Sequence, residues 1–368
     1  MAGFPFMRQA ETFLSSLPFI LLLAVFILPC PMSAAAKPRP AIAFVHLLLP
    51  PGGEPHASPA GWIGSLDRAR DTLESLRIPT IVSSASPGNA EDLNELSEMD
   101  PEVLITTSPL LYAAACDVAK RSPNTVFFAC TDETVHDNMS GFQARTYEAH
   151  YLAGLIAGAL SEDGVIGYLA NDPYQSKASR LRNANAFTLG AQKSKAAIRV
   201  LYAPGNDPDE ELKTLIAAGA DIVDLERALP SLVERLREHS VHYVGTAGRT
   251  VDPLCLAAPE WEWSNAFGDL LTQVRFGIWR PRNVSYGIKE GVVGLSPFGP
   301  AVPETVRVRV REAKEAIRNG ASPFEGPVRD VSGSLRIAEG SVPDDATLRG
   351  MDWRVQGLEP LPLTPDGL

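Results

Sequence analysis

The chain has 368 residues, a length typical of about two domains, and its hydrophobic content of 45% is enough to build full cores. Lysine and arginine together number 33 against 44 aspartates and glutamates, which gives a net charge of −11. Because the chain is this acidic and has no basic run, we expect it not to bind nucleic acid.

The first 36 residues have the features of a secretory signal peptide. A positive charge precedes an apolar run at 17–32, and small residues at 33–36 precede Lys37. Prolines interrupt the short apolar run, which favours cleavage before Lys37 and leaves an uncleaved N-terminal anchor as the alternative. A lipid anchor at Cys30 is less favoured, since Pro29 stands where such signals carry a small residue. We expect export to the periplasm or another extracytoplasmic face.

From residue 41 onward, short apolar strands alternate with amphipathic helices, the pattern of a parallel sheet covered on both faces. The first series has predicted strands at 41–49, 80–83, 103–106 and 125–130 and predicted helices at 62–76, 90–98 and 110–121. The second has predicted strands at 165–170, 199–202, 222–225 and 241–245 and predicted helices at 147–160, 178–193, 207–218 and 229–239. We therefore expect an α/β protein with two doubly wound halves.

The pattern becomes irregular after residue 245. A helix is predicted at 261–278, a strand-like run at 285–295 and a charged amphipathic helix at 303–319, and a possible hairpin lies at 331–337. In the helix at 147–160, Gly154 and Gly158 lie four residues apart. Residues four apart share a helix face, so we interpret the two glycines as a site of close helix packing.

The usual signatures of catalysis are missing from the sequence. It has no phosphate-binding loop, no dinucleotide fingerprint and no nucleophile elbow, and its cysteines and histidines lack the spacing of a metal site. We therefore predict no catalytic residues, no metal and no cofactor. Two α/β lobes without catalytic groups are suited to hold a small molecule in a cleft and to close over it by a hinge.

Several short stretches resemble one known family in their order and spacing. They are Thr106-Thr107-Ser108, the run YLAG at 151–154, NAFTLGA at 185–191, GIKEGV at 287–292 and MDW at 351–353. Over essentially the whole mature chain, the sequence resembles the solute-binding proteins of the basic membrane protein family, purine-nucleoside receptors of ABC importers. The resemblance implies a type I periplasmic binding fold, with a ligand held between two hinged lobes and passed to an ABC transporter permease.

The resemblance also implies a division of the chain into lobes. Residues 37–135 plus about 246–285 would form the N-terminal lobe, and about 136–245 plus about 286–320 the C-terminal lobe. Residues 321–368 would be a C-terminal extension that packs on the body. We expect the protein to act as a monomer.

Ligand-binding roles follow from the resemblance only where residues match. Trp62 stands where the family has an aromatic ring that stacks on the base, Asp132 matches a ligand-facing acidic residue, and Lys289 matches a lysine near the last cleft strand. Trp261, with Trp263, repeats a paired-tryptophan context. Each keeps an alternative: core packing for the tryptophans, a turn or cap for Asp132 and a solvated surface position for Lys289.

Two further candidates are Ser108 and Arg249. Ser108, just past a strand, could bond a ligand or cap the next helix. Ala247 and Arg249 replace two aspartates that hold the ribose in the nucleoside-binding relatives. The ligand is therefore predicted to be a nucleobase without its sugar, or a small anionic metabolite gripped by Arg249. Alternatively, Arg249 points to solvent or pairs with a carboxylate.

Three other functions remain open at this point. The chain could be a ligand-sensing module for a membrane signalling receptor, an enzyme in the same fold, or a divergent member that has lost small-molecule binding.

Overall fold

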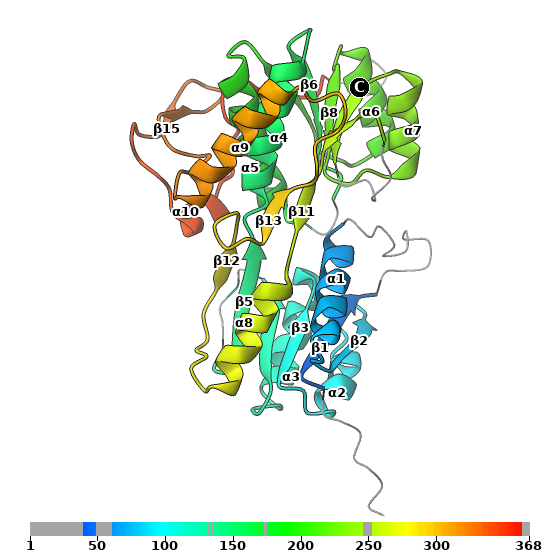
Figure 1. Ribbon diagram of the computed structural model, residues 1–368, viewed down its shortest axis with the longest axis vertical. Helices are drawn as coiled ribbons and strands as arrows, with labels where there is room; N and C mark the ends of the chain where they lie inside the picture. The colour runs from blue at the N-terminus through cyan, green and yellow to red at the C-terminus, as the bar shows by residue number, and fades with distance from the viewer. Residues whose placement is uncertain are drawn as a thin grey trace, which may run out of the picture. The chain divides into compact units, whose positions relative to one another are not determined.

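The computed structural model describes residues 40–48, 61–131, 133, 136–172, 175–245 and 252–362. They belong to one compact unit, residues 39–368. Two six-stranded sheets organise this unit, and every pair of neighbouring strands in them is parallel (Figure 1). The predicted α/β class with two parallel-sheet lobes is confirmed.

The first sheet has the strand order β12-β5-β4-β3-β1-β2. Its strands are β1 (Ile42–Leu47), β2 (Thr80–Ala85), β3 (Val103–Thr106), β4 (Val126–Cys130), β5 (Met139–Ala144) and β12 (Val284–Tyr286). Successive residues of β1 point to opposite faces, so Phe44 packs under α1 (Trp62–Ser75) and α8 (Ser264–Arg275). Val45 packs on the other face, under α2 (Glu91–Ser97) and α3 (Tyr112–Ala119), and a short 3₁₀ turn, η1 (Pro109–Leu111), precedes α3.

The second sheet has the strand order β10-β9-β8-β6-β7-β16. Its strands are β6 (Val165–Leu169), β7 (Arg199–Ala203), β8 (Ile222–Leu225), β9 (His242–Gly245), β10 (Cys255–Ala257) and β16 (Leu358–Pro360). The helices α4 (Tyr147–Leu160) and α5 (Lys177–Ser194) cover one face, and α6 (Pro208–Ala217) and α7 (Pro230–Glu238) cover the other. The helix α9 (Glu304–Arg318) packs against α4.

Both sheets repeat one topology. Within the first, the order β2-β1-β3-β4-β5 places the second strand of the series outside the first, and β7-β6-β8-β9-β10 does the same in the second. The order in which strands are added along the sheet therefore reverses between β1 and β3, and again between β6 and β8, while all the strands stay parallel. In doubly wound sheets, ligands bind at the carboxyl ends of the strands that flank this reversal.

Two strands lie in a lobe other than the expected one, and one expected strand proves to be two strands. The strand β5 (Met139–Ala144) joins the first sheet, although the boundary at residue 135 would place it in the C-terminal lobe. Conversely, β10 lies within 246–285 but pairs with β9 of the second sheet. The strand expected at 285–295 is two strands: β12, in the first sheet, and β13 (Val293–Leu295), which pairs with β11 (Pro259–Trp261). Beyond these segments, the assignment of residues to lobes stays a prediction.

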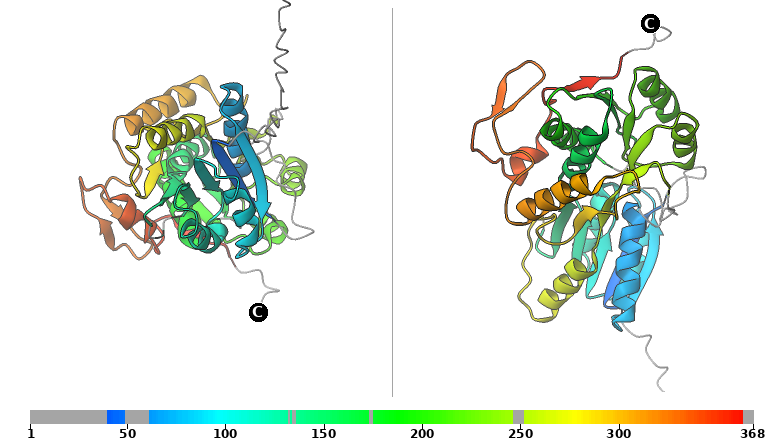
Figure 2. Two further views of the ribbon diagram at one scale, coloured as in Figure 1. Left: turned by 90° about the horizontal axis from the view of Figure 1, so that it is seen from below. Right: turned by 45° about the horizontal axis from the view of Figure 1, so that its top comes forward.

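The C-terminal segment packs against the second lobe, beside α5 (Figure 2). It contains β14 (Val328–Arg329), β15 (Leu335–Ile337), α10 (Asp345–Arg349) and β16. The buried Asn185 amide on α5 donates to the Trp353 carbonyl over 2.8 Å and accepts from the Val355 N–H over 2.9 Å. Two stretches that carried the resemblance, around 185 and 351–353, are thus in direct contact.

Candidate functional site

At the carboxyl edge of the first sheet, Trp62 is the first residue of α1 and is half-buried. Its indole N–H donates to the Thr107 carbonyl, just past β3, over 2.8 Å. Its ring meets those of Trp261 and Trp263 edge to face, with ring centroids 5.8 and 5.2 Å apart, and lies nearly parallel to Phe142 at 6.4 Å. The hydrogen bond and the three rings fix the orientation of Trp62, so a ligand would meet a preformed aromatic surface.

Trp261 supports this cluster from β11. Its side chain is 8% exposed, and its indole N–H donates to the Thr146 hydroxyl over 3.1 Å. Trp263 is completely buried, and its ring lies nearly parallel to that of Phe267 at 5.5 Å. Core packing therefore accounts for most of the surface of both rings, as the alternative interpretation held.

Ser108 lies at the beginning of η1, directly after the same strand end. It is 3% exposed, and its hydroxyl accepts from the Leu110 N–H over 3.3 Å. The capping role is thus confirmed, and a bond to a ligand stays a prediction. Asp132 and Arg249 lie outside the described residues.

Lys289 is exposed in the turn between β12 and β13, next to an ion-pair network. In that network the Arg145 guanidinium, 16% exposed, pairs with Glu148 over 2.7 Å and with Glu290. The Glu148 carboxylate also accepts from the Ile288 N–H over 2.6 Å, and the Glu290 carboxylate from the Gly287 N–H over 2.7 Å. The chain leaving β5 and the chain leaving β12 are thereby tied together.

Glu290→Ala is expected to lower the free energy of unfolding by about 1–2 kcal/mol, because a charge-assisted hydrogen bond to half-buried Arg145 is lost. Lys289, the exposed neighbour, provides a matched control. Lys289→Ala should change the free energy of unfolding by less than about 0.5 kcal/mol. Urea unfolding of the two variants beside the wild type measures both. Equal losses in the two variants would contradict the assigned role of Glu290.

Sequence reasoning missed a second group at the edge of the first sheet. The His46 ring, on β1, has Nδ1 3.1 Å from the Thr107 hydroxyl and Nε2 3.3 Å from an Asp67 carboxylate oxygen on α1. The Thr107 hydroxyl also donates to the Val45 carbonyl over 3.2 Å. His46 therefore joins two strands and a helix directly behind the carbonyl that holds Trp62. A histidine inside an apolar strand was the signal in the sequence.

The carboxyl edge of the second sheet carries a buried polar cluster that the sequence analysis also missed. Asp224, on β8 and 0% exposed, accepts from His150 Nδ1 over 2.9 Å. Glu226, two residues on and 7% exposed, accepts from the Tyr168 hydroxyl over 2.9 Å. The signal was an acidic residue inside the apolar run at 222–225.

Burial controls the protonation of this cluster. Burial first, and the neighbouring Asp172 carboxylate second, together raise the pKa of the Glu226 carboxyl to about 8. The pKa of His150 is raised as well: burial opposes the charged ring, but the Asp224 carboxylate outweighs that effect. At neutral pH the Glu226 carboxyl is therefore mainly uncharged.

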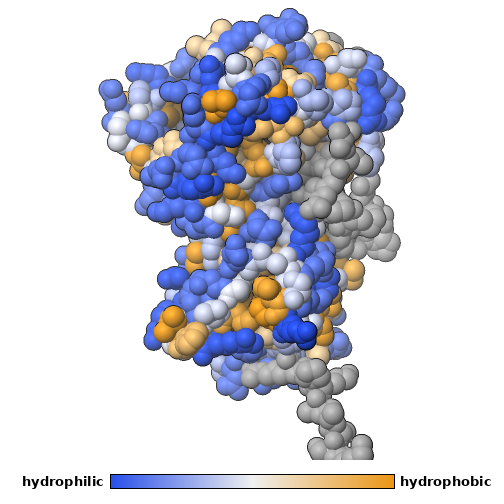
Figure 3. All heavy atoms as spheres, in the orientation of Figure 1, coloured by the Kyte–Doolittle hydropathy of each residue, from blue (hydrophilic) through white to orange (hydrophobic). Residues whose placement is uncertain are grey.

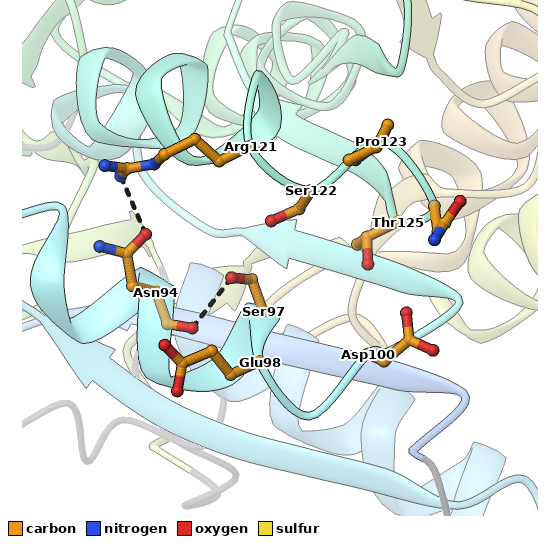
Figure 4. Close-up of a pocket in the computed structure, with 9 residues that line it drawn as sticks. Asn94, Ser97, Glu98, Asp100, Arg121, Ser122, Pro123 and Thr125 are labelled. Carbon is orange, nitrogen blue, oxygen red and sulfur yellow. Dashed lines mark hydrogen bonds between the residues drawn. The ribbon is translucent and has the colours of Figure 1, made fainter.

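A hollow of about 450 Å³ lies away from these groups (Figure 4). It opens at the amino ends of β3 and β4, between the ends of α2 and α3, and its lining is polar: Asn94, Ser97, Glu98, Asp100, Arg121, Ser122, Pro123, Asn124 and Thr125. The Arg121 guanidinium donates to the Asn94 side chain over 2.9 Å. Since ligands of doubly wound sheets bind at the opposite, carboxyl edge, we do not assign the ligand site to this hollow.

Two further observations on the described residues concern metal binding and membrane crossing. Nowhere among them do three or more His, Cys, Asp or Glu side chains come together in a way that could hold a metal ion. In the same part of the chain, no helix combines the length and the apolar character needed to cross a bilayer. The face seen in Figure 3 is mostly hydrophilic, with apolar residues in small groups.

Comparison with solved structures identifies the fold. A solute-binding protein of an ABC transporter system from Conexibacter woesei superimposes with a TM-score of 0.60 over 76% of this chain and 97% of its own, at 17% identity. With the two parallel sheets described above, this confirms the two-lobed type I periplasmic binding fold.

Comparison with known sequences finds two relatives and one matching family model. A purine-binding protein of Brucella abortus is 28% identical over 89% of this chain and 95% of its own. A protein of Haloferax volcanii named as an ABC transporter glucose-binding protein is 28% identical over 77% of this chain and 78% of its own. Residues 66–217 match the family model Bmp, described as ABC transporter substrate-binding protein, PnrA-like. Such proteins bind a small molecule outside the cytoplasm for a membrane permease. The chain is therefore similar to the Bmp family of ABC transporter substrate-binding proteins, through the family model over residues 66–217 and through a purine-binding relative over most of its length.

Proposed function

We propose that this protein is the exported receptor of an ABC importer and that its ligand is a small planar molecule of the purine class, held between the two lobes. Half-buried Trp62 carries the proposal: a fixed indole stands at the carboxyl edge of the first sheet, where ligands of this fold class bind. The similarity to a purine-binding protein over most of both chains supports the same ligand class.

In this proposal each predicted site residue has its own role in binding the ligand. Trp62 stacks on the ring system, and Trp261 holds it from behind. Asp132 accepts hydrogen bonds from ring or amino N–H groups, Ser108 and Lys289 contribute polar contacts at the rim, and Arg249 binds an acceptor-rich edge. Binding closes the lobes, and the permease recognises the closed form. The mature chain begins at Lys37, acts as a monomer and carries out no reaction of its own.

Trp62→Ala should weaken binding of the cognate base by roughly 10- to 100-fold, since stacking of a base on an aromatic side chain contributes about 1–3 kcal/mol. Trp62→Phe keeps a ring and should stay within about fivefold of the wild type. Calorimetric titration of the protein with adenine, guanine, hypoxanthine, the matching nucleosides and glucose measures the affinities, and circular dichroism checks that both variants fold.

Two results would contradict the proposal. One is a wild-type protein that binds glucose or a small anion and none of the purines. The other is a folded Trp62→Ala variant with unchanged affinity for the purine that the wild type binds.

A further inference from the structure

The helix α8 ends in a turn that exposes two large apolar side chains. Phe276 is 76% exposed and Ile278 is 64% exposed. The Ile278 N–H donates to the Gln273 carbonyl over 3.0 Å. The N–H of Gly277, whose φ is +66°, donates to the Val274 carbonyl over 3.0 Å. These two bonds form a Schellman motif, a regular end of a helix, so an ordered turn holds Phe276 and Ile278 in their exposed positions.

This turn lies at the amino edge of the first sheet. Arg275, the last residue of α8, pairs with Glu102, directly before β3, over 2.8 Å. The Arg282 N–H, on the way to β12, donates to the Ser140 hydroxyl near the start of β5 over 3.1 Å. Figure 1 shows α8 descending along the first lobe to this turn, from which the chain returns to β12. The turn is therefore at the edge of the sheet opposite to Trp62.

The segment 275–283 is rich in positive charge. It has no acidic residue, and its three arginines, Arg275, Arg280 and Arg282, are all exposed. The charge of Arg275 is balanced by Glu102. The Arg280 guanidinium donates to two backbone carbonyls of its own turn, over 3.1 and 2.6 Å. Neither Arg280 nor Arg282 has an ion pair with a described residue, so the segment carries two uncompensated positive charges.

The end of α1 adds to this surface, because α1 and α8 pack side by side on one face of the sheet. Leu76, directly after α1, is 66% exposed, and Arg77, which follows it, is also exposed. The acidic residues Glu98 and Asp100 of the same edge follow α2, on the other face. In Figure 3 the lower end of this lobe shows apolar groups beside strongly hydrophilic ones. The amino-edge surface therefore consists of Leu76, Arg77, Phe276, Ile278, Arg280 and Arg282.

Exposed aromatic and aliphatic side chains beside arginines are the combination that binds an anionic bilayer surface. The apolar groups enter the boundary between lipid headgroups and acyl chains, and the guanidinium groups stay with the headgroup phosphates. Each arginine near an anionic surface strengthens binding by about fivefold. Because the chain as a whole has a net charge of −11, this local positive charge also determines which end would face the lipid.

The first described residues lie at the same edge. The Ala41 N–H donates to the Pro79 carbonyl over 2.8 Å, and the Ala41 carbonyl accepts from the Val103 N–H over 3.0 Å. In the sequence, residues 33–40 separate Ala41 from the apolar run at 17–32, and a segment of that length spans at most about 30 Å. In a chain that kept this run in a bilayer, the amino edge would stay close to that bilayer. The position of the edge thus favours a lipid surface as its partner.

We propose that the amino-edge surface binds the anionic lipid surface of the membrane. This contact keeps the receptor at the bilayer between encounters with the permease, and it leaves the carboxyl edge, where the ligand would bind, uncovered. The inference goes beyond the proposed function and does not depend on the identity of the ligand.

Co-sedimentation with lipid vesicles tests the proposal. Residues 37–368, which contain the whole compact unit, are mixed with vesicles of phosphatidylcholine alone or of phosphatidylcholine and phosphatidylglycerol in equal parts. Two double variants are compared with the wild type: the serine variant, Phe276→Ser with Ile278→Ser, and the glutamine variant, Arg280→Gln with Arg282→Gln.

A matched control removes exposed apolar side chains elsewhere on the protein. Val331→Ser with Leu335→Ser changes two residues of the C-terminal segment, which are 49% and 51% exposed. This control should bind the vesicles within about twofold of the wild type. Circular dichroism establishes that each variant is folded, and analytical ultracentrifugation without vesicles gives its oligomeric state.

The wild type should bind the phosphatidylglycerol vesicles at least about 25-fold more tightly than the neutral ones, and about 0.5 M salt should remove most of this difference. The glutamine variant should lose about 25-fold, the product of two fivefold effects. The serine variant should lose at least about tenfold, because it no longer buries two apolar side chains in the lipid. Both arginines are exposed, so the glutamine variant keeps the test valid even where the serine variant does not fold.

Three outcomes would overturn the proposal. The first is equal binding of the wild type to both kinds of vesicle, and the second is a folded serine variant that binds like the wild type. The third is a wild-type dimer that the serine variant separates into monomers, which would make a second copy of the chain the partner of this surface. The first two leave the purine proposal untouched, and the third contradicts only its monomeric state; titration of the same proteins with adenine tests the ligand separately.

Discussion

Gly154→Ala is expected to lower the free energy of unfolding by about 3 kcal/mol or more, because the helices α4 and α5 leave no room for a methyl group between them. A Cβ at Gly154 would lie 2.1 Å from the Phe187 carbonyl oxygen and 3.0 Å from the Ala191 nitrogen. These are backbone atoms of α5, which cannot move aside as a flexible side chain could. Gly158 has the same constraint, 2.2 Å from the Ala191 carbonyl oxygen, and the predicted close packing is confirmed.

Gly268→Ala provides the matched control for this substitution. Gly268 is also inside a helix, α8, but a Cβ there would meet only a Leu73 methyl group at 3.9 Å. The change should be neutral or should stabilise the protein by up to about 1 kcal/mol, since alanine favours helix more than glycine does. Urea unfolding measures both variants. If Gly154→Ala unfolds at the same urea concentration as Gly268→Ala, the tight contact between α4 and α5 is not what stabilises this lobe.

The stability of the wild type is expected to fall as the pH rises from about 4.5 to about 8, and Glu226→Gln should flatten that fall. The ordinary pKa of a glutamate is 4.5, and burial raises that of Glu226 to about 8. Between these values the folded protein keeps a proton that the unfolded chain releases, so each pH unit costs at most about 1.4 kcal/mol. Below pH 4.5 both states are protonated, and the contribution of Glu226 is fully present.

His150 acts in the same direction at higher pH. Its pKa is raised above the ordinary 6.5, so the stability that it contributes is lost as the pH rises through its folded pKa. Glu226→Gln should thus be more stable than the wild type at pH 8. The part of the pH dependence of stability that comes from His150 should remain in this variant. Unfolding by urea at pH 5, 6, 7, 8 and 9 gives the curves, and Glu210→Gln, a change at an exposed residue of α6, should follow the wild type. A Glu226→Gln curve parallel to that of the wild type would show that Glu226 is already ionised at neutral pH.

The regular elements of the two series could be predicted from the sequence because each strand is an apolar run and each helix has one apolar face. The helix predicted at 147–160 and the strands predicted at 103–106 and 222–225 agree with α4, β3 and β8 at both ends. The strand β5 was missed because its sequence, MSGFQA, has small and polar residues among its apolar ones. Its assignment to the first sheet depends on pairing with β4, which no local pattern reveals.

The candidate site was predictable only in part. Trp62 was found because an aromatic residue opens a helix after the first strand, and the resemblance gave it a role. His46 and Asp67 are 21 residues apart, and Tyr168 and Glu226 are 58 apart. Contacts at such separations follow from strand order and register, which hydrophobic periodicity does not determine. An acidic residue inside an apolar strand was visible, but its partners were not.

The C-terminal segment also has a consequence for solubility. The strand β16 pairs with β7, and the Leu361 N–H donates to the Tyr202 carbonyl over 2.9 Å. Without β16, the backbone N–H and C=O groups on that side of β7, a strand with the buried apolar residues Val200 and Leu201, would be open to water and to other chains. A chain ending before Leu358 would therefore present an unprotected sheet edge to its copies, and aggregation by strand addition would be expected before any loss of the lobe itself.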